Sequence, residues 1–175
     1  MFGTLALNNS DLLILILICF FAGLIRGFSG FGLSAFVMSL ALTIIPPIEL
    51  IPVCWWMEFF ASVYMIKNGW KDSDKKISII LWFGAIFGLP IGILLTTILD
   101  FQTSKIVALV LILILALILL RNFKIQFLST TVGTILSGVF AGIATGLASI
   151  GGMIVAIYVL ASQNSARRMR ASLVL

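Results

Sequence analysis

Histidine is absent from this chain of 175 residues, which contains only two cysteines and six acidic residues. Cys19 and Cys54 lie far apart inside apolar segments, so no spacing of residues is typical of a metal site. We therefore expect no metal and no cofactor, and we interpret both cysteines as buried, unreactive thiols. No serine or cysteine has a neighbouring candidate base, so the sequence also lacks the residues of nucleophilic catalysis. These absences disfavour an enzyme.

Charged residues are scarce as well: they make up 10% of the chain, against about 25% in an average soluble domain. Apolar residues make up 62% and form long segments with almost no charge, namely Leu12–Ile25, Leu33–Ile45, Ile48–Ile66, Ile77–Leu99, Ile106–Leu120 and Phe127–Ile150. Several segments reach the roughly 20 residues that span the hydrocarbon core of a bilayer as a helix. Strands of a membrane barrel would instead show short alternating stretches. We predict an all-α integral membrane protein, a polytopic helical bundle.

The net charge of +5 comes from eleven basic residues, most of which lie in three connections between apolar segments. The positive-inside rule places these connections, Lys67–Lys76, Arg121–Lys124 and Arg167–Arg170, in the cytoplasm. The N-terminus then lies outside, whether the first two apolar segments each cross the membrane or form a re-entrant pair. Because the basic residues occur where orientation signals belong, nucleic-acid binding is not expected. A signal peptide is disfavoured because no basic residue precedes Leu12.

The chain matches itself at an offset of 119 residues. Phe21–Gly27 aligns with Phe140–Gly146, and Gly32 aligns with Gly151. In the predicted topology the first copy begins outside, whereas the second begins after a cytoplasmic connection, so the two copies run in opposite senses. Inverted repeats of this kind are typical of secondary transporters.

The match divides the chain into two unequal parts. We assign residues 1–126 to a first inverted repeat, consisting of a broken helix pair and three transmembrane helices. Residues 127–175 form the start of a second, incomplete repeat. Nothing typical of a helix terminus follows Arg170, and the chain stops at Leu175 within the start of another apolar stretch. We therefore expect a fragment or a truncated reading frame.

Each copy is divided by a glycine-rich break, Gly27–Gly32 in the first and Ser149–Gly152 in the second. Glycine allows the backbone to unwind and approach a ligand, and the N-termini of half-helices offer N–H groups to an anion. We predict a binding site for a small anion where the two breaks approach each other near the bilayer midplane, formed by Gly27, Ser29, Gly30, Gly32, Ser149, Gly151 and Gly152. Close helix packing is the alternative for both breaks.

Small residues recur elsewhere at helical spacing. Gly84, Gly88 and Gly92 follow each other at intervals of four residues, a spacing that lets two helices touch. For this row we prefer the packing interpretation. Gly23-x-x-x-Gly27 and Gly142-x-x-x-Gly146 have the same spacing.

Arg26 ends the first apolar segment, directly before the first break. A charge deep in a bilayer costs at least about 2.5–3.5 kcal/mol, so it usually has a partner or a wet cavity. We predict that Arg26 belongs to the anion site and that its partner is Glu58, near the middle of its own apolar segment. Three interpretations of the pair stay open: a structural ion pair, a substrate clamp with proton coupling, or both.

Hydroxyl groups near the two breaks are further candidate donors to an anion. They belong to Ser29, Ser34, Thr145 and Ser149. Serine and threonine in membrane helices more often bond their own backbone, which is the alternative for each of them.

Four stretches, Ala22–Gly32, Phe83–Gly92, Ile150–Gly152 and Ala166–Ala171, resemble the TauE/SafE sulfite exporter family of membrane permeases. The resemblance covers nearly the whole chain, although Met153 stands where the family pattern has a third glycine or a proline. It implies a bacterial inner-membrane protein with two inverted repeats. It also implies export or uptake of sulfite, sulfonates or related sulfur and organic anions.

These observations together predict a secondary transporter, a permease of small anions, in the inner membrane. Its expected partners are the anion and the lipid bilayer, with a proton as the candidate coupling ion. A non-transporting membrane subunit or assembly partner is the alternative function. The embedded Arg26 and the paired breaks argue against that alternative, because a scaffold requires neither.

Overall fold

The computed structural model describes residues 8–72, 75–121, 128 and 130–161. The regular elements in this part of the chain are all helices: α1 (Asn9–Ser29), α2 (Leu33–Ala41), α3 (Pro47–Asp72), α4 (Lys75–Ile98), α5 (Phe101–Arg121), α6 (Thr131–Ala148) and α7 (Gly151–Ala161). Five of them, α1, α3, α4, α5 and α6, contain spans long and apolar enough to cross a membrane. The predicted all-α, multi-pass membrane fold is confirmed.

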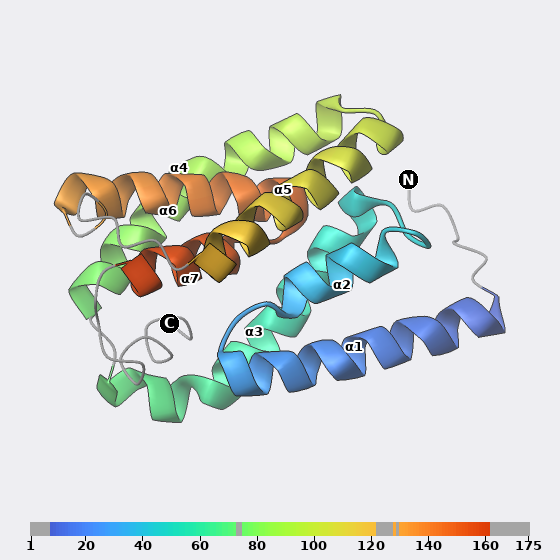
Figure 1. The fold of residues 1–175 in the computed structure, drawn as a ribbon, viewed down its shortest axis with the longest axis horizontal. Helices are drawn as coiled ribbons and strands as arrows, with labels where there is room; N and C mark the ends of the chain where they lie inside the picture. The colour runs from blue at the N-terminus through green and yellow to red at the C-terminus, as the bar shows by residue number, and fades with distance from the viewer. Residues whose placement is uncertain (1–7, 73–74, 122–127, 129, 162–175) are drawn as a thin grey trace.

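The helices run roughly along one common axis (Figure 1). The end of α3, the start of α4 and the start of α6 lie at one end of this axis. The start of α1 and the connections α2–α3 and α4–α5 lie at the opposite end. The long helices therefore follow one another in the alternating directions that the positions of the basic connections predict. Lys124 and Arg167–Arg170 are outside the described residues, so their predicted location stays a prediction.

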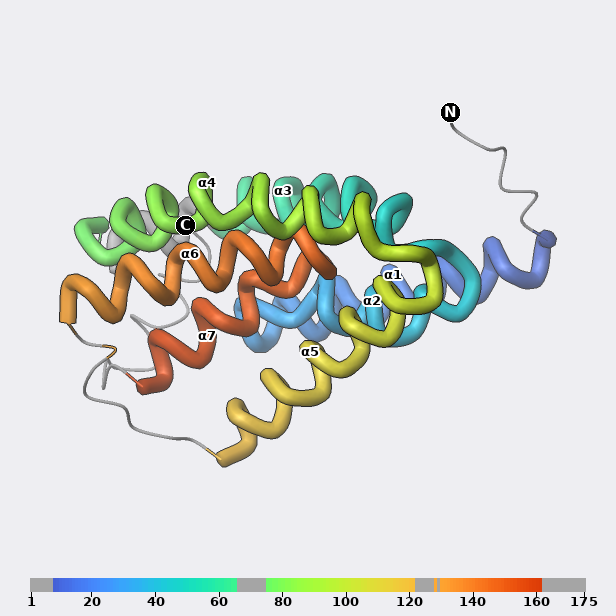
Figure 2. Tube along the Cα trace, turned by 90° about the horizontal axis from the view of Figure 1, so that it is seen from above, coloured from blue at the N-terminus to red at the C-terminus, as the bar shows by residue number. Residues whose placement is uncertain are grey.

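Two of the helices are too short to span a membrane alone. At about 1.5 Å per residue, the 9 residues of α2 and the 11 residues of α7 fall well short of the roughly 30 Å hydrocarbon core. Each short helix follows a long one and returns beside it, α2 beside α1 and α7 beside α6 (Figures 1 and 2). The first two apolar segments are thus one long helix and one short returning helix.

The first break is shorter than the sequence analysis predicted. Helix α1 continues through Gly27 and ends at Ser29, where Gly30 adopts a left-handed conformation with φ 82° and its N–H donates to the carbonyl of Arg26 (2.8 Å). Gly32 is also left-handed, with φ 88°, and α2 begins directly after it. The prediction that Gly27 is non-helical is therefore wrong. The helical hydrogen bonds continue until a residue with positive φ ends them, and Gly30 is the first such residue.

The second break is shorter than predicted as well, with two residues between the helices. Helix α6 ends at Ala148, Ser149 is left-handed with φ 56°, and α7 begins at Gly151. Gly151 and Gly152 were predicted to be non-helical and are instead the first two residues of α7. Ser149 is the non-glycine residue with positive φ in the described part of the chain, a conformation that L-residues adopt at a cost.

The main apolar core receives buried side chains from every described helix except α4. These are Ile18 and Ala22 of α1, four residues of α2, Leu50, Ile51 and Cys54 of α3, and residues of α5, α6 and α7. Leu33 after the first break and Ile150 in the second belong to this same core, so both breaks border it. Cys54 is fully buried, as expected, whereas Cys19 is only partly buried.

Helices α4 and α6 pack backbone against backbone. A methyl group added at Gly84, Gly88 or Gly92 would overlap main-chain atoms of α6, and one added at Gly142 would overlap those of α4. The hydroxyl of Thr96 donates across the same contact to the carbonyl of Gly146 (3.0 Å). The packing interpretation of the glycine row on α4 is confirmed. Gly23 and Gly27 of α1 differ, because a methyl group added there has no described atom within 4 Å.

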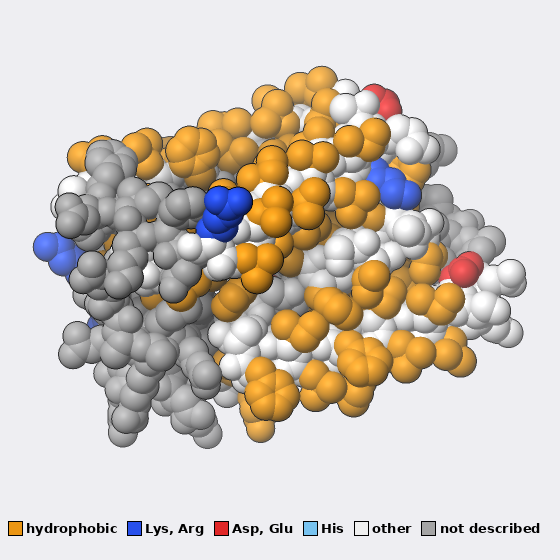
Figure 3. All heavy atoms as spheres, in the orientation of Figure 1, with side chains coloured by type: hydrophobic (Ala, Val, Ile, Leu, Met, Phe, Trp, Pro, Cys, Tyr) orange, Lys and Arg blue, Asp and Glu red, His pale blue; other side chains and the backbone are white. Residues whose placement is uncertain are grey.

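The outer faces of the long helices are apolar. Phe28, Phe87 and Leu120 have 80%, 71% and 80% of their surface exposed, and many other large apolar side chains are similar. Figure 3 shows hydrophobic side chains over most of the described part of one face, with few charged ones between them. A surface of this kind is stable against lipid, which is as apolar as the side chains themselves.

Candidate functional site

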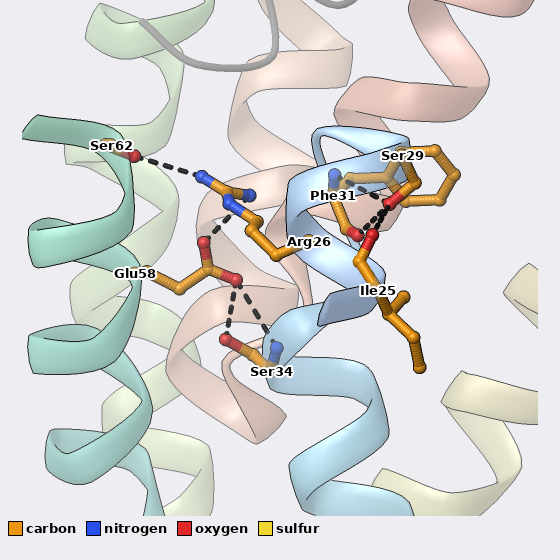
Figure 4. Close-up of polar contacts among 7 residues, drawn as sticks. All are labelled: Ile25, Arg26, Ser29, Phe31, Ser34, Glu58 and Ser62. Carbon is orange, nitrogen blue, oxygen red and sulfur yellow. Dashed lines mark hydrogen bonds and ion pairs between the residues drawn. The ribbon is translucent and has the colours of Figure 1, made fainter. Parts of the chain in front are cut away.

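Arg26 lies in the last turn of α1, and its side chain points toward α3 (Figure 4). Only 5% of the residue is exposed. Its Nη1 atom is 2.8 Å from Oε2 of Glu58, and its Nη2 atom donates to Oγ of Ser62 (2.9 Å). Its Nε atom is buried and has no hydrogen-bond partner among the described residues. The predicted pairing of Arg26 with Glu58 is thus present, and the Nε donor of the guanidinium remains unused.

Glu58 connects α1 and α3 with the start of α2. While Oε2 pairs with Arg26, Oε1 accepts hydrogen bonds from the hydroxyl (2.9 Å) and the backbone N–H (3.3 Å) of Ser34. Ser34 is the second residue of α2, where backbone N–H groups lack a partner within the helix. The N-cap residue Gly32 has no side chain to accept them, so Glu58 from α3 caps α2.

The first break brings these groups together. The two left-handed glycines, Gly30 and Gly32, reverse the chain, so the N-terminus of α2 lies next to the last turn of α1. An L-residue with a Cβ atom adopts this conformation only at a cost, which explains glycine at both positions. Arg26 and Ser34 thus face the same carboxylate although the chain turns between them.

Burying the polar cluster of Arg26, Glu58, Ser34 and Ser62 costs free energy. Removing a guanidinium and a carboxylate from water costs several kcal/mol per ion, and a close pair offsets this only with good geometry and further hydrogen bonds. Here the two Ser34 donors and the Ser62 hydroxyl provide those bonds. Glu58 is less buried than its partner, with 27% of its side chain exposed against 6% for Arg26.

Ser29 points away from this cluster (Figure 4). Its hydroxyl lies within hydrogen-bond distance of the carbonyls of Ile25 (2.8 Å) and Phe31, and it accepts from the N–H of Phe31 (3.2 Å). The side chain therefore closes the turn of the first break. Gly27 is helical and exposed, and it makes no side-chain contact with the cluster because it has no side chain.

The second break carries fewer polar groups. Ser149 is 6% exposed, and no hydrogen bond of its side chain is present in the described part of the chain. A methyl group added at Gly151 would overlap Oγ1 of Thr145 and the carbonyl of Ala141, so this glycine allows α7 to pack on α6. Gly152 is exposed and has no described neighbour within 4 Å of an added methyl. Thr145 bonds its own helix, donating to Ala141 (2.7 Å).

The two breaks begin at corresponding residues at the offset found in the sequence. Helix α1 ends at Ser29 and α6 at Ala148, which are 119 residues apart, and the next residues, Gly30 and Ser149, are both left-handed. Figure 1 shows α1 and α6 running in opposite directions along the common axis. Arg26 corresponds to Thr145, so the positive charge belongs to the first break alone.

Sequence reasoning missed Ser62 as a member of the cluster. It follows Glu58 by four residues on α3, so both side chains lie on one face of the helix, and this spacing was the available signal. The cluster as a whole offers a guanidinium, hydroxyls and a helix N-terminus, which are groups that bind oxyanions. In the part of the chain that the structure describes, no three His, Cys, Asp or Glu residues are grouped as a metal site requires.

Comparison with known proteins identifies a family. The profile of the family described as Sulfite exporter TauE/SafE matches residues 15–175, which is most of the chain. No curated protein and no solved structure shows a significant match. A buried arginine at a helix break in a bundle of membrane-spanning helices suits a permease, and the chain belongs to the TauE/SafE sulfite exporter family of membrane transporters.

Proposed function

We propose that this protein moves a small oxyanion across the inner membrane as a secondary transporter, with Arg26 supplying the positive charge of the substrate site. The observation that carries the proposal is the state of Arg26: it is 5% exposed, and its buried Nε has no partner among the described residues. A buried, unsatisfied donor on a charged group costs free energy, and such groups in membrane helices are typically functional.

The substrate class follows from the donors and from the family. Sulfite, sulfonates and related sulfur or organic anions carry several oxygen atoms that accept charge-assisted hydrogen bonds from a guanidinium. The family description names sulfite. The hydroxyl and N–H of Ser34 lie on the same side of the first break and are further donors for such an anion.

We assign the second break to the other side of the same site. Ser149 and Gly151 correspond to Gly30 and Gly32 of the first break, Gly152 directly follows Gly151, and both breaks border one apolar core. The opposite directions of α1 and α6 support inverted repeats formed by residues 1–126 and 127–175. Alternating access by inverted repeats is typical of secondary transporters. We propose no catalytic role for any residue.

Glu58 is our candidate for the group that takes the coupling proton. Among the described residues it is the carboxylate next to Arg26, and its side chain is partly exposed. Neutralising it would leave Arg26 free to balance the charge of the transported anion.

Anion-dependent thermal stabilisation tests the binding function. The purified chain is heated with sulfite, sulfate, thiosulfate or an alkyl sulfonate, and the midpoint of unfolding is recorded. A bound anion at 100 times its dissociation constant stabilises the folded state by about 2.7 kcal/mol, so the midpoint should rise with concentration. Arg26→Lys keeps the charge but loses the planar fork, so we expect weaker stabilisation, and with Arg26→Gln none. Equal stabilisation of wild type and Arg26→Gln would contradict the assignment.

A further inference from the structure

The carboxylate of Glu58 occupies the position that an oxyanion substrate would take. We propose that Glu58 is a tethered competitor: without substrate it fills the anion seat between Arg26 and the N-terminus of α2, and a substrate binds only when Glu58 leaves this seat. The inference rests on the proposed function, since it concerns the regulation of the same site.

Both oxygen atoms of Glu58 are bonded to groups that recognise anions. Oε2 contacts the guanidinium of Arg26 at 2.8 Å, and Oε1 accepts from the hydroxyl and the N–H of Ser34 at 2.9 Å and 3.3 Å. A guanidinium, a hydroxyl and a helix N-terminus are the set that a bound oxyanion uses. The carboxylate of Glu58 thus lies where we propose that an anionic ligand binds.

Glu58 is also the more exposed partner of the ion pair. Its side chain is 27% exposed, whereas that of Arg26 is 6% exposed. Arg26 is the more buried partner and also donates to Ser62, which lies one turn beyond Glu58 on α3, so we expect the carboxylate to be the group that moves. Its replacement by a substrate returns an anionic partner to both Arg26 and Ser34.

The charges around the seat allow only one anion at a time. Arg26 on α1 is the cation that contacts Glu58, and Cys54 lies one turn earlier on α3. Helices α2, α6 and α7, which pack in the same core, contain no Asp, Glu, Lys or Arg. The carboxylate of Glu58 and a substrate anion would therefore share one positive charge, and their repulsion means that Glu58 must leave the site when the substrate binds.

The footprint of Glu58 also limits the substrate class. The carboxylate bridges Arg26 and Ser34 with two different oxygen atoms. A substrate that replaces it must likewise present two oxygens, as sulfonates, sulfite and carboxylates do and chloride does not. The unused Nε of Arg26 offers one more donor, which suits an anion with three oxygens.

Binding of methanesulfonate to the purified full chain at neutral pH tests the proposal, because this anion is fully ionised and presents three oxygen atoms. We compare wild type, Glu58→Gln and Arg26→Gln, with chloride as the single-atom control anion and circular dichroism as the check on folding. Glu58→Gln keeps an oxygen for Ser34 and removes the competing charge. We expect its affinity for methanesulfonate to exceed that of wild type by about tenfold or more.

Wild type supplies a second measurement that needs no variant to fold. It should bind methanesulfonate at least about tenfold more tightly than chloride, because the groups that Glu58 contacts bind two separate oxygen atoms. Weaker binding of methanesulfonate to Glu58→Gln than to wild type, or equal affinities of wild type for chloride and methanesulfonate, would overturn the proposal. If wild type binds and Arg26→Gln does not, these results leave the proposed function intact. If neither wild type nor Glu58→Gln binds any anion, the proposed function falls, and this inference with it.

Discussion

At the scale of single residues, the site depends on where two glycines lie and on one charge. Gly30 and Gly32 are left-handed, and the turn that they make places Ser34 beside the carboxylate that pairs with Arg26. Gly27 lies three residues earlier and is an ordinary helical residue. The glycines of the first break therefore differ in their conformational requirements, although the sequence shows them as one cluster.

The substitutions Gly30→Ala and Gly27→Ala test this difference. A Cβ atom in the left-handed conformation costs about 1–2 kcal/mol, so Gly30→Ala should lower the midpoint of thermal unfolding and weaken anion binding. Gly27→Ala, in an open helical position, should leave stability unchanged or raise it by about 0.5–1 kcal/mol. Differential scanning fluorimetry of the two purified variants measures both effects. Equal destabilisation by the two substitutions would show that the break begins at Gly27 after all.

For single residues, the sequence predicts contacts best where burial in a membrane restricts the possible partners of a side chain. A charge within an apolar segment needs a partner, and this requirement alone paired Arg26 with Glu58, as the structure shows. It did not show that Gly27 is helical, because glycine is compatible with helix and turn alike. Ser62 was missed because serine is common in membrane helices, and only the packing of α3 on α1 brings it to Arg26.

At the scale of helices, the two short elements α2 and α7 distinguish this fold from a simple bundle. Apolar composition predicted the long helices, because about 20 apolar residues in lipid can only be helical. It could not predict the exact ends, which depend on caps. Residues with positive φ end α1 and α6, and Thr130 caps α6 by accepting a hydrogen bond from the N–H of Gly133 (3.1 Å).

Asp100, which directly precedes α5, provides a cap with a measurable pH dependence. Its carboxylate accepts from the hydroxyl of Thr103 (2.6 Å) and from the N–H of Thr103 (3.1 Å), and these hydrogen bonds lower the pKa of Asp100 below its ordinary value of 3.8. A lowered pKa in the folded state means that the cap contributes its full stability above pH 3.8. That stability is lost as the pH falls through the lowered value.

We therefore expect Asp100→Ala to lower the unfolding midpoint of the purified protein at pH 7 and to have a smaller effect at a pH below the lowered pKa. Asp100→Asn, which can still accept hydrogen bonds as a cap, should retain most of the stability at both pH values. Thermal unfolding of the three proteins at neutral and acidic pH measures this. A difference between wild type and Asp100→Ala that grows on acidification would contradict the cap.

At the scale of the whole molecule, the described chain contains two long helices that each end in a left-handed residue and are each followed by a short returning helix. The weak internal match in the sequence predicted this correspondence, and the basic connections predicted the opposite directions that Figure 1 shows. The close contact of α4 with α6 through their glycines has no described equivalent on α1, where Gly23 and Gly27 face open space. The helix pairs α1–α2 and α6–α7 thus correspond at the ends of their long helices, and they differ in how closely the long helix packs against a neighbour.

The central claim is that Arg26 carries the charge of a transported oxyanion. Uptake of a radiolabelled sulfonate or sulfite into proteoliposomes tests it most directly, with wild type, Arg26→Gln and the control Gly27→Ala of the adjacent residue at matched incorporation. We predict uptake by wild type and Gly27→Ala, and uptake by Arg26→Gln no greater than by liposomes without protein. Equal rates for wild type and Arg26→Gln would show that Arg26 is a structural charge and would contradict the account.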